Sequence, residues 1–378
     1  MNKTSAPRTG VTTGLCAAAA AKAAAEALFS QNTVETVTVS AKNGQAITLE
    51  TQGFTLSCGA VKCGVKKYSG DDPDVTDGLT VYAEVSKTDA DGIITVDGGE
   101  GVGRATKPGL KVPVGCAAIN PVPMEMIKNA VGEACGKYSY FGGIKVVVSI
   151  PGGDAIARST MNERLGVVGG LSVLGTTGIV EPMSERAILE TIKAEIDVLA
   201  AAGVKRLLLT PGNYGRDFAR DTLSININDA VKCSNYIGET LDHACAKGFD
   251  RITLIGHAGK LVKVAGGIMN THSDTADCRM EIIAAHCALC GAERELAERI
   301  MDCVSVEAAV CEMIASGLNE RVWESIGKKI GFHLAERAGK TRSLQSEKAL
   351  PESGGARPAQ IEYIVFTNEH GVLARGIC

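Results

Sequence analysis

The chain has 378 residues, of which 45% are hydrophobic and 4% aromatic, and it contains 44 glycines. This composition suits a globular α/β protein with many tight turns better than a fibrous or disordered one. The 39 basic and 43 acidic residues give a net charge of -4, which is too balanced for a nucleic-acid partner. A chain of this length exceeds one ordinary core, so we expect two domains.

No apolar run approaches the roughly 20 residues that cross a bilayer, so no membrane span is expected. The alanine-rich stretch 17–25 contains Lys22, is followed by Glu26, and lacks the leucine-rich centre of a signal peptide. We therefore expect a cytoplasmic protein whose 13 cysteines are mostly reduced core thiols. Cys287 and Cys290 have the spacing of zinc ligands but lack a second pair, so no protein-held metal is predicted.

The first part of the chain combines long helices with short strands. Thr12 and Thr13 offer hydroxyl groups to cap an alanine-rich helix that runs to about Phe29. A second helix begins after Asn120, and Gly and Asp turns separate several β-branched segments. The expected strands are 34–40, 46–56, 79–85, 93–96 and 144–150. We expect residues 1–163 to form an α+β domain.

From residue 164 the pattern changes to strand, glycine turn and helix, which predicts a parallel sheet in an α/β domain over residues 164–378. Residues 340–360 are polar and rich in Gly and Pro, so we expect a mobile loop there. The expected strands are 165–174, 204–210, 251–255 and 361–366. The expected helices are 184–202 and 235–247, with further helices over 276–338.

Two Thr-Thr-Gly turns are candidate ligand-binding elements. Gly175, Thr176, Thr177 and Gly178 follow an expected strand, and the same tripeptide occurs at 12–14, each time before an expected helix. Glycine permits close approach of a ligand, while hydroxyl groups and helix N-terminal amides bind carboxylates. The alternative is an ordinary capped turn that binds nothing.

A further glycine turn follows the next strand. Gly212, Asn213 and Gly215 would let the backbone approach a cofactor, and the Tyr214 ring could stack on a planar group. The alternative is a plain Gly-Asn turn. If the strands ending at 174, 210 and 255 are parallel, the loops after them meet at one edge of the sheet and form a cleft.

The block 255–281 is dense in histidines, lysines, glycines and carboxylates, which suggests a site. Because histidine titrates near neutral pH, His257 and His272 are the candidate general bases. The Gly259-Lys260 pair does not belong to a P-loop, since leucines occupy the positions where that motif needs glycine and Ser or Thr.

An acidic segment and a basic glycine loop complete the candidates. Residues 69–78 contain four carboxylates, Asp72 among them, which could coordinate a cation, attract a cationic ligand or act as acid and base. Turn formation by Asp, Pro and Gly is the alternative. Arg104 ends the glycine-rich run 98–104, which could accept phosphate or carboxylate, although a Gly-x-Gly alone is weak evidence.

These segments together resemble one family, the cobalt-precorrin-5B C(1)-methyltransferases of anaerobic cobalamin synthesis, known as CbiD. The resemblance covers nearly the whole chain. It is carried by RTGVTTG (8–14), GDDPDVT (70–76), GEGVG (99–103), AINPVP (118–123), LGTTGIVEPMS (174–184), PGNYG (211–215), SNYIG (234–238) and the block 257–281. Asp77 stands where the family often has histidine and Cys116 where an acidic residue is frequent, so no role is assigned to either.

The resemblance implies methyl transfer from S-adenosylmethionine to C-1 of a cobalt-containing tetrapyrrole. It also implies a ribosomal-S5-like α+β unit followed by a Rossmann-like α/β unit. The glycine turns at 175–178 and 212–215 are the expected donor contacts. Because the substrate carries many carboxylates, the expected contacts with them are Thr12, Thr13, Arg104, Lys260 and Lys263. Asp72 of the acidic segment is a further expected substrate contact.

Two other classes of function remain open at this stage. A non-catalytic corrinoid-binding protein would bind the tetrapyrrole without needing the methyl donor. A phosphotransferase on an S5-like unit is disfavoured by the missing P-loop. The sequence leaves homo-oligomer formation open.

Overall fold

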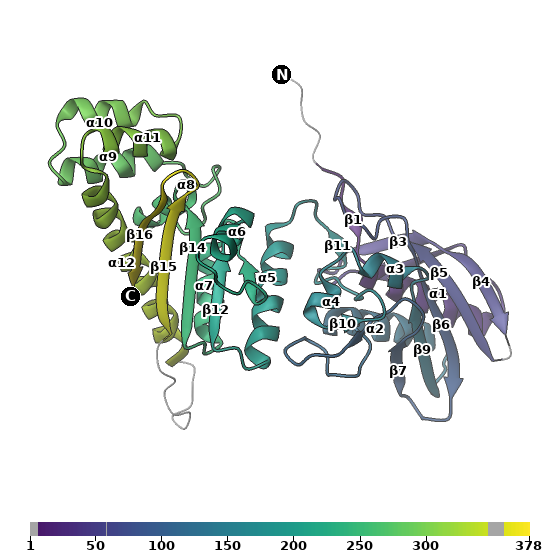
Figure 1. Cartoon of the computed structure of the whole chain (residues 1–378). Helices are drawn as coiled ribbons and strands as arrows, with labels where there is room; N and C mark the ends of the chain where they lie inside the picture. The colour runs from purple at the N-terminus through teal and green to yellow at the C-terminus, as the bar shows by residue number, and fades with distance from the viewer. Residues whose placement is uncertain (1–6, 58, 347–358) are drawn as a thin grey trace, which may run out of the picture. The chain divides into compact units, whose positions relative to one another are not determined.

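The computed structural model describes residues 7–57, 59–346 and 359–378, and the chain divides into two compact units, Met1–Ala187 and Ile188–Cys378 (Figure 1). We call them unit 1 and unit 2. The expected boundary after residue 163 is earlier than this division, because residues 167–168 and 179–180 pair with strands of unit 1. Within the described ranges, no helix is both long and apolar enough to cross a membrane.

Unit 1 is built on a five-stranded sheet in the order β4-β5-β6-β9-β7, in which only β7 and β9 are parallel. Buried residues alternate along β5 and β6, as expected for strands with one covered face. The strands are β4 (Gln52–Ser57), β5 (Ala60–Lys66), β6 (Thr80–Thr88), β7 (Ile94–Gly98) and β9 (Gly143–Ser149). The sequence analysis did not predict β5.

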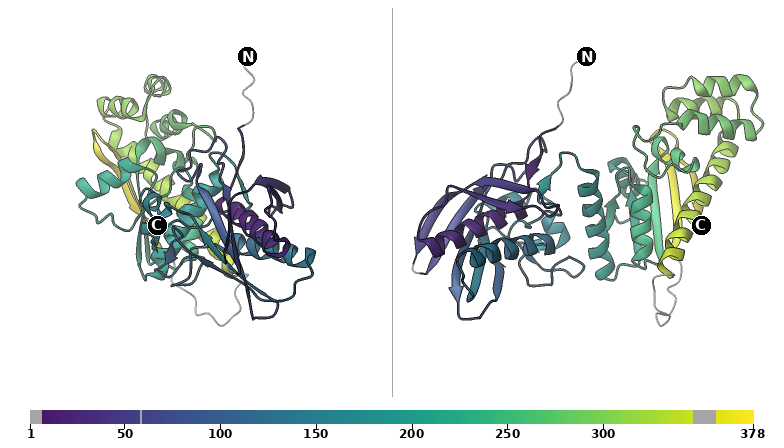
Figure 2. Two further views of the ribbon diagram at one scale, coloured as in Figure 1. Left: turned by 90° about the vertical axis from the view of Figure 1, so that its right-hand side faces the viewer. Right: turned by 180° about the vertical axis from the view of Figure 1, so that it is seen from behind.

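Two helices, α1 (Thr13–Ser30) and α2 (Pro121–Lys137), lie side by side against this sheet (Figure 2, right). The alanines of α1 are buried nearly all round, and their small side chains let the helix approach α2 and the sheet closely. The hairpin of β2 (Thr36–Ser40) and β3 (Ala46–Glu50) also packs near α1. The expected strand 46–56 is therefore two strands, β3 and β4.

Short elements complete unit 1. The strand β1 (Gly10–Val11) pairs with β11 (Ile179–Val180), and β8 (Arg104–Ala105) pairs with β10 (Val167–Val168), both antiparallel. The short helices are α3 (Gly153–Ala157) and α4 (Asn162–Leu165).

Two predictions about this region were wrong. The expected parallel strand 165–174 contains only the two residues of β10, because the glycine-rich segment after it forms isolated bridges within unit 1. The turn 176–178 does not open a helix either, since β11 follows it directly.

Unit 2 contains a five-stranded sheet in the order β13-β12-β14-β15-β16, parallel except for the edge strand β16. The expected strand 361–366 corresponds to β15, but the chain then turns back and forms β16, which the sequence analysis missed. The strands are β12 (Arg206–Thr210), β13 (Ala230–Lys232), β14 (Arg251–His257), β15 (Gln360–Thr367) and β16 (Gly371–Ile377).

Helices cover both faces of this sheet unequally. On one face, Leu207 and Leu209 belong to a large core with the helices, whereas Leu208 points to a smaller core with Phe218 of α6. The long helix α12 lies along β15 and β16 (Figures 1 and 2). The helices are α5 (Glu185–Ala201), α6 (Asn213–Asp221), α7 (Ile237–Ala246), α8 (Ala258–Ala265), α9 (Arg279–Leu289), α10 (Arg294–Met301), α11 (Val306–Ala315) and α12 (Asn319–Ser346).

The strand order places a topological switch between β12 and β14. From β12 the chain crosses to β13 on one side, and from β14 it proceeds to β15 on the other. In open α/β sheets, ligands bind outside the carboxyl ends of two such strands. Of the expected loop 340–360, residues 340–346 continue α12, which contradicts the prediction there, and residues 347–358 lie outside the described residues.

Candidate functional site

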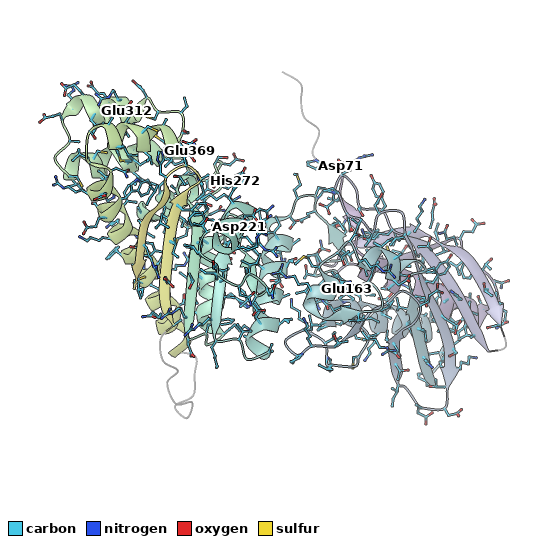
Figure 3. The ribbon with its side chains drawn as sticks, viewed as in Figure 1. Asp71, Glu163, Asp221, His272, Glu312 and Glu369 are labelled. Atoms are coloured by element: carbon cyan, nitrogen blue, oxygen red, sulfur yellow. The ribbon has the colours of Figure 1, made fainter. Side chains whose placement is uncertain are left out.

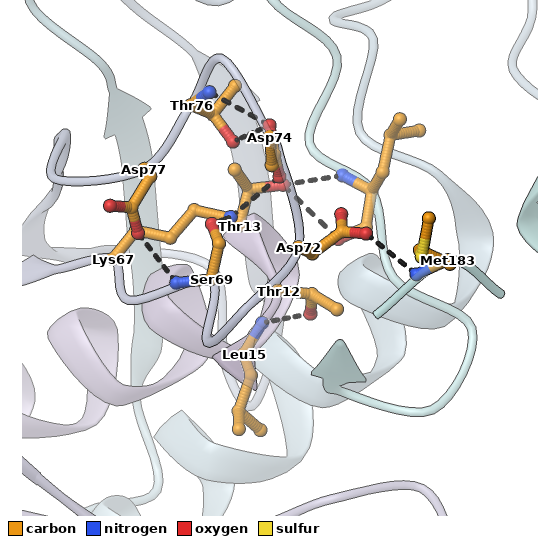
Figure 4. A network of polar contacts seen from close by, with 11 residues as sticks. Thr12, Thr13, Leu15, Lys67, Ser69, Asp72, Asp74, Thr76, Asp77 and Met183 are labelled. Atoms are coloured by element: carbon orange, nitrogen blue, oxygen red, sulfur yellow. Dashed lines mark hydrogen bonds and ion pairs between the residues drawn. The ribbon is translucent and has the colours of Figure 1, made fainter. Parts of the chain in front are cut away.

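The first Thr-Thr-Gly turn begins α1 and binds the segment 174–178 directly (Figure 4). The Thr12 hydroxyl caps the helix by accepting the backbone N–H of Leu15 at 3.2 Å. The Thr13 hydroxyl accepts the N–H of Leu174 at 2.9 Å and donates to its carbonyl at 3.2 Å. The Thr12 N–H also donates to the carbonyl of Gly178 at 3.0 Å, so both threonines join the two motifs that the sequence singled out.

Glycine is needed on both sides of this junction. A Cβ on Gly14 would lie 2.9 Å from the carbonyl oxygen of Leu174, and a Cβ on Gly175 would lie 2.2 Å from the Thr12 hydroxyl oxygen. Gly175 also has a φ of +137°, which other residues rarely adopt. The close approach of α1 to this turn thus explains why the glycines stand beside the threonines. The Thr176 side chain is left exposed.

The acidic segment folds around a buried lysine. Lys67 is 2% exposed, and its ammonium lies 2.7 Å from the Asp74 carboxylate and 2.5 Å from the Ser69 hydroxyl. Burial alone would raise the pKa of Asp74, but hydrogen bonds from Lys67 and Thr76 outweigh it and hold that pKa below its usual value. Asp77 accepts the N–H of Ser69 at 2.7 Å. These contacts make Asp74 and Asp77 structural members of the loop.

Asp72 and Arg104, both expected to contact substrate, have partners within unit 1. The Asp72 carboxylate accepts the N–H of Met183 at 3.0 Å, so it joins the acidic loop to the segment after β11. The Arg104 guanidinium pairs with Asp97 at 3.1 Å and also donates to the carbonyl of Gly115. Arg104 remains half exposed.

In unit 2, Tyr214 and His257 lie together at the carboxyl ends of β12 and β14. Their ring centroids are 6.4 Å apart, and the Phe366 ring meets His257 edge-on at 5.6 Å. The predicted turn 212–215 is the N-terminus of α6, and Tyr214 is 69% exposed there. The prediction that the loops after residues 210 and 255 meet at one edge is confirmed, whereas the segment after 174 belongs to unit 1.

Both ring nitrogens of His257 have partners. Nδ1 accepts the N–H of Gly259 at 3.2 Å and thereby caps α8, and Nε2 lies 2.8 Å from the carboxylate of Glu307 at the start of α11. In the neutral ring, the Nδ1 lone pair is engaged by the helix and the Nε2 proton by Glu307. This arrangement fixes the orientation of the ring.

The lysines of α8 differ in their partners. The Lys260 ammonium donates to the Asn235 side-chain oxygen at 2.5 Å. The Lys263 side chain is buried, and its ammonium donates to the carbonyls of Ala276 at 2.7 Å and Thr271 at 3.3 Å. Lys263 therefore holds the loop after α8, and its hydrogen-bonding capacity is largely used there.

His272 lies on this loop, at the surface of unit 2 (Figure 3). Its side chain is 46% exposed, and Nδ1 accepts the N–H of Asp274 at 3.2 Å. No residue in the described ranges forms a hydrogen bond with its other ring nitrogen, Nε2.

Sequence reasoning missed several residues that organise these sites. Glu307 carries no local signal because its partner, His257, is distant in the chain. Lys67 carries none because its partner, Asp74, lies in a segment of turn-forming residues. Asn235 lies in the segment SNYIG, but only the fold places it against Lys260. The predicted residues fall into two groups, one in each unit, with Thr12, Thr13, Asp72, Arg104 and 175–178 in unit 1.

A cavity of about 610 Å³ lies elsewhere in unit 2, between α12 and the β15–β16 hairpin. Trp323, His370 and Arg375 are among its lining residues, and none of the predicted site residues lines it. Across the described part of the chain, no three His, Cys, Asp or Glu side chains are grouped so as to hold a metal ion.

Comparison with known proteins gives matches over most of the chain. The CbiD family model matches residues 1–182, and the model of the CbiD C-terminal domain matches residues 270–376. A cobalt-precorrin-5B C(1)-methyltransferase of Ruminiclostridium cellulolyticum is 50% identical over 87% of this chain and 85% of its own. One of Alkaliphilus metalliredigens is 41% identical over 97% and 92%.

One solved structure is also similar, a cobalamin biosynthesis protein (cbiD) from Archaeoglobus fulgidus. It is 29% identical, covers 71% of this chain and 83% of its own, and has a TM-score of 0.39. The sequence identity to the two curated relatives is far above chance and extends over most of their lengths. This chain therefore belongs to the CbiD family.

Proposed function

We propose that this chain transfers a methyl group from S-adenosyl-L-methionine to C-1 of cobalt-precorrin-5B, giving cobalt-precorrin-6A in anaerobic cobalamin biosynthesis. The observation that carries the proposal is the 50% identity to a relative named for this reaction, over 87% of the chain. The mixed α/β architecture, with a parallel-strand switch point in unit 2, agrees with a small-molecule enzyme.

The proposed donor contacts in unit 2 are Gly212, Asn213, Tyr214 and Gly215. S-adenosylmethionine supplies an electrophilic methyl group when bound. The exposed Tyr214 ring suits stacking on an adenine, and the first turn of α6 has backbone N–H groups and no acidic residue. In unit 1, residues 175–178 remain proposed donor contacts, with the exposed Thr176 the best placed.

Most of the proposed substrate contacts are residues that can bind the many carboxylates of the tetrapyrrole. Lys260 is the strongest candidate, because its hydrogen-bond partner is a neutral amide. Thr12, Thr13 and Arg104 of unit 1 remain proposed carboxylate contacts, with internal hydrogen bonds that would keep them in place. Asp72 remains a proposed substrate contact of the acidic segment, for groups other than carboxylates. For Lys263 we propose a supporting role, since its ammonium is tied to backbone carbonyls.

Methyl transfer from a sulfonium is an in-line displacement, so alignment and exclusion of water are the main requirements. Of the two candidate bases, we propose that His272 accepts a proton and that His257 positions α8. To accept a proton, His272 needs a free lone pair, which costs only the hydrogen bond from the N–H of Asp274. His257 would instead lose its cap of α8 or its contact with Glu307.

The test is to incubate the pure chain with methyl-labelled S-adenosylmethionine and cobalt-precorrin-5B, and to locate the label in the product. Label at C-1 is the expected result. Binding of the tetrapyrrole without binding of S-adenosylmethionine in calorimetry would instead identify the alternative, a non-catalytic corrinoid-binding protein. A cytoplasmic location remains a prediction from the sequence, and homo-oligomer formation remains open.

A further inference from the structure

Three lysines gather near the carboxyl end of β13 and the start of α8. Lys232 ends β13, Lys260 lies in the first turn of α8, and Lys263 follows one turn later. Lys263 has backbone carbonyl partners and lies 3.8 Å from Asp277. Lys260 differs, because no carboxylate of the described residues lies within ion-pair distance of its ammonium and its partner is the amide oxygen of Asn235.

The surroundings of Lys260 oppose a positive charge. The side chain is half buried, and burial lowers its pKa. The charges of Lys232 and Lys263 lower it as well, whereas Cys233 acts in the opposite direction. The positive end of the α8 dipole also lies here, and the first turn of that helix contains no acidic residue. An anion bound beside Lys260 would relieve all of these costs at once.

Asn235 is held so that its side-chain oxygen faces Lys260. Its backbone carbonyl accepts the N–H of Thr271 at 2.9 Å, and its side-chain oxygen accepts the Thr271 hydroxyl at 3.4 Å. The loop that carries Thr271 is in turn fixed by Lys263. The Lys260 ammonium therefore keeps one hydrogen bond to a neutral group and has two further donors for a ligand.

We propose that Lys260, oriented by Asn235 and supported by the charge of Lys232, is a carboxylate-binding subsite of unit 2. This inference rests on the proposed function, since both the tetrapyrrole and the amino-acid end of the methyl donor carry carboxylates. Asn235 is a positioning residue, and Lys232 adds to the local positive charge.

The experiment measures binding of two probes to the full chain by calorimetry. One is S-adenosylmethionine, and the other is uroporphyrin, a stable tetrapyrrole with carboxylates on all its peripheral substituents. Lys260→Met should weaken binding of one probe about tenfold, the effect of losing a charge-assisted hydrogen bond, and Asn235→Ala should weaken the same probe. The probe that loses affinity identifies which ligand supplies the carboxylate.

Lys205→Ala is the matched control, because Lys205 is an exposed lysine immediately before β12, at the opposite edge of the same sheet. It should bind both probes as the unmodified chain does. Lys260→Met should also melt at a higher temperature without ligand, since it removes a half-buried charge whose hydrogen-bond partner is neutral. A cooperative melting transition of this variant also shows that it folds.

Unchanged affinity of Lys260→Met for both probes, or failure of the unmodified chain to bind either, would overturn the inference. If the unmodified chain transfers the labelled methyl group while Lys260→Met binds both probes normally, the subsite is wrong and the function stands. If no methyl is transferred but binding still depends on Lys260, the subsite stands and the proposed function is wrong.

Discussion

Lys67 and Lys260 show how one residue type serves two purposes in this chain. Lys67 is buried and paired with Asp74, so its charge is balanced inside the acidic loop. Lys260 is half buried and hydrogen-bonded to a neutral amide, so its charge remains available. The difference in hydrogen-bond and ion-pair partners separates a structural lysine, Lys67, from Lys260, which we propose as a ligand contact.

The pairing of Lys67 predicts a pH-dependent stability. Asp74→Ala should lower the free energy of unfolding by about 3 kcal/mol at neutral pH, because it leaves a buried ammonium unpaired. The pKa of Asp74 is held below its ordinary value, so its contribution is complete above about pH 4 and disappears as the pH falls further. Urea unfolding of the unmodified chain and of Asp74→Ala as a function of pH should show that the difference in their free energies of unfolding decreases in acid.

The control for that experiment is Asp71→Ala, since Asp71 pairs with the exposed Arg8 at the surface of the same loop. Exposed ion pairs contribute little, so this variant should unfold much like the unmodified chain. Equal destabilisation by both variants would contradict the role assigned to Lys67.

Tyr214 gives a second prediction at this scale. Tyr214→Ala should weaken binding of S-adenosylmethionine about tenfold, because it removes an exposed ring suited to stacking on the adenine. Tyr214→Phe keeps the ring and should bind nearly normally. Titration calorimetry measures both, and an affinity in Tyr214→Ala equal to that of the unmodified chain would remove Tyr214 from the donor site.

Among the elements, α1 shows how close packing requires small residues, alanine and glycine, at particular positions. Its alanines and Gly14 let the helix start against the carbonyl of Leu174 and continue along α2 and the sheet. Glycine is unfavourable inside a helix, so its presence in the first turn of α1 follows from tertiary contact and not from helix propensity.

Gly14→Ala and Gly132→Ala should therefore change stability in opposite directions. The added Cβ of Gly14→Ala would collide with Pro123 and the Leu174 carbonyl, at a cost of about 2 kcal/mol. At Gly132 in α2 the nearest atom is 4.0 Å away, so alanine should stabilise the chain by about 0.5–1 kcal/mol. Chemical denaturation measures both, and a stabilising Gly14→Ala would contradict the close contact.

At the scale of the whole molecule, the chain contains two units with separate cores. The buried cluster of unit 1 ends at Val173, and the larger cluster of unit 2 begins at Ile192. Among the described residues, no buried residue belongs to both clusters. We therefore expect substitutions in one core to destabilise that unit alone.

Calorimetry should show this independence. Ile127→Ala in unit 1 and Leu334→Ala in unit 2 each remove a fully buried side chain, at a cost of about 3 kcal/mol. Each should lower the Tm of one transition by roughly 6–12 °C and leave the other unchanged. A single transition that both variants shift equally would indicate that the units unfold together.

Local patterns in the sequence determined most elements of this fold. The capping threonines and alanines predicted α1, alternating β-branched segments predicted β2, β6 and β9, and the strand–turn–helix pattern predicted β12, β14 and α7. The motifs also identified the family and singled out Tyr214 and His257, whose ring centroids lie 6.4 Å apart in the fold. Short-range patterns suffice here because hydrophobic period and caps act within a few residues.

Only the tertiary structure decided which unit the segment 164–187 joins, and what each polar side chain binds. The glycine-rich stretch 165–174 looks like a buried strand, but its hydrogen bonds go to β8, to residues 101–103 and 118–120, and, from Leu174, to Thr13. Asn235 and Lys260 are 25 residues apart in the chain and meet at 2.5 Å. Such contacts depend on long-range hydrogen bonds and packing, which hydrophobic period does not encode.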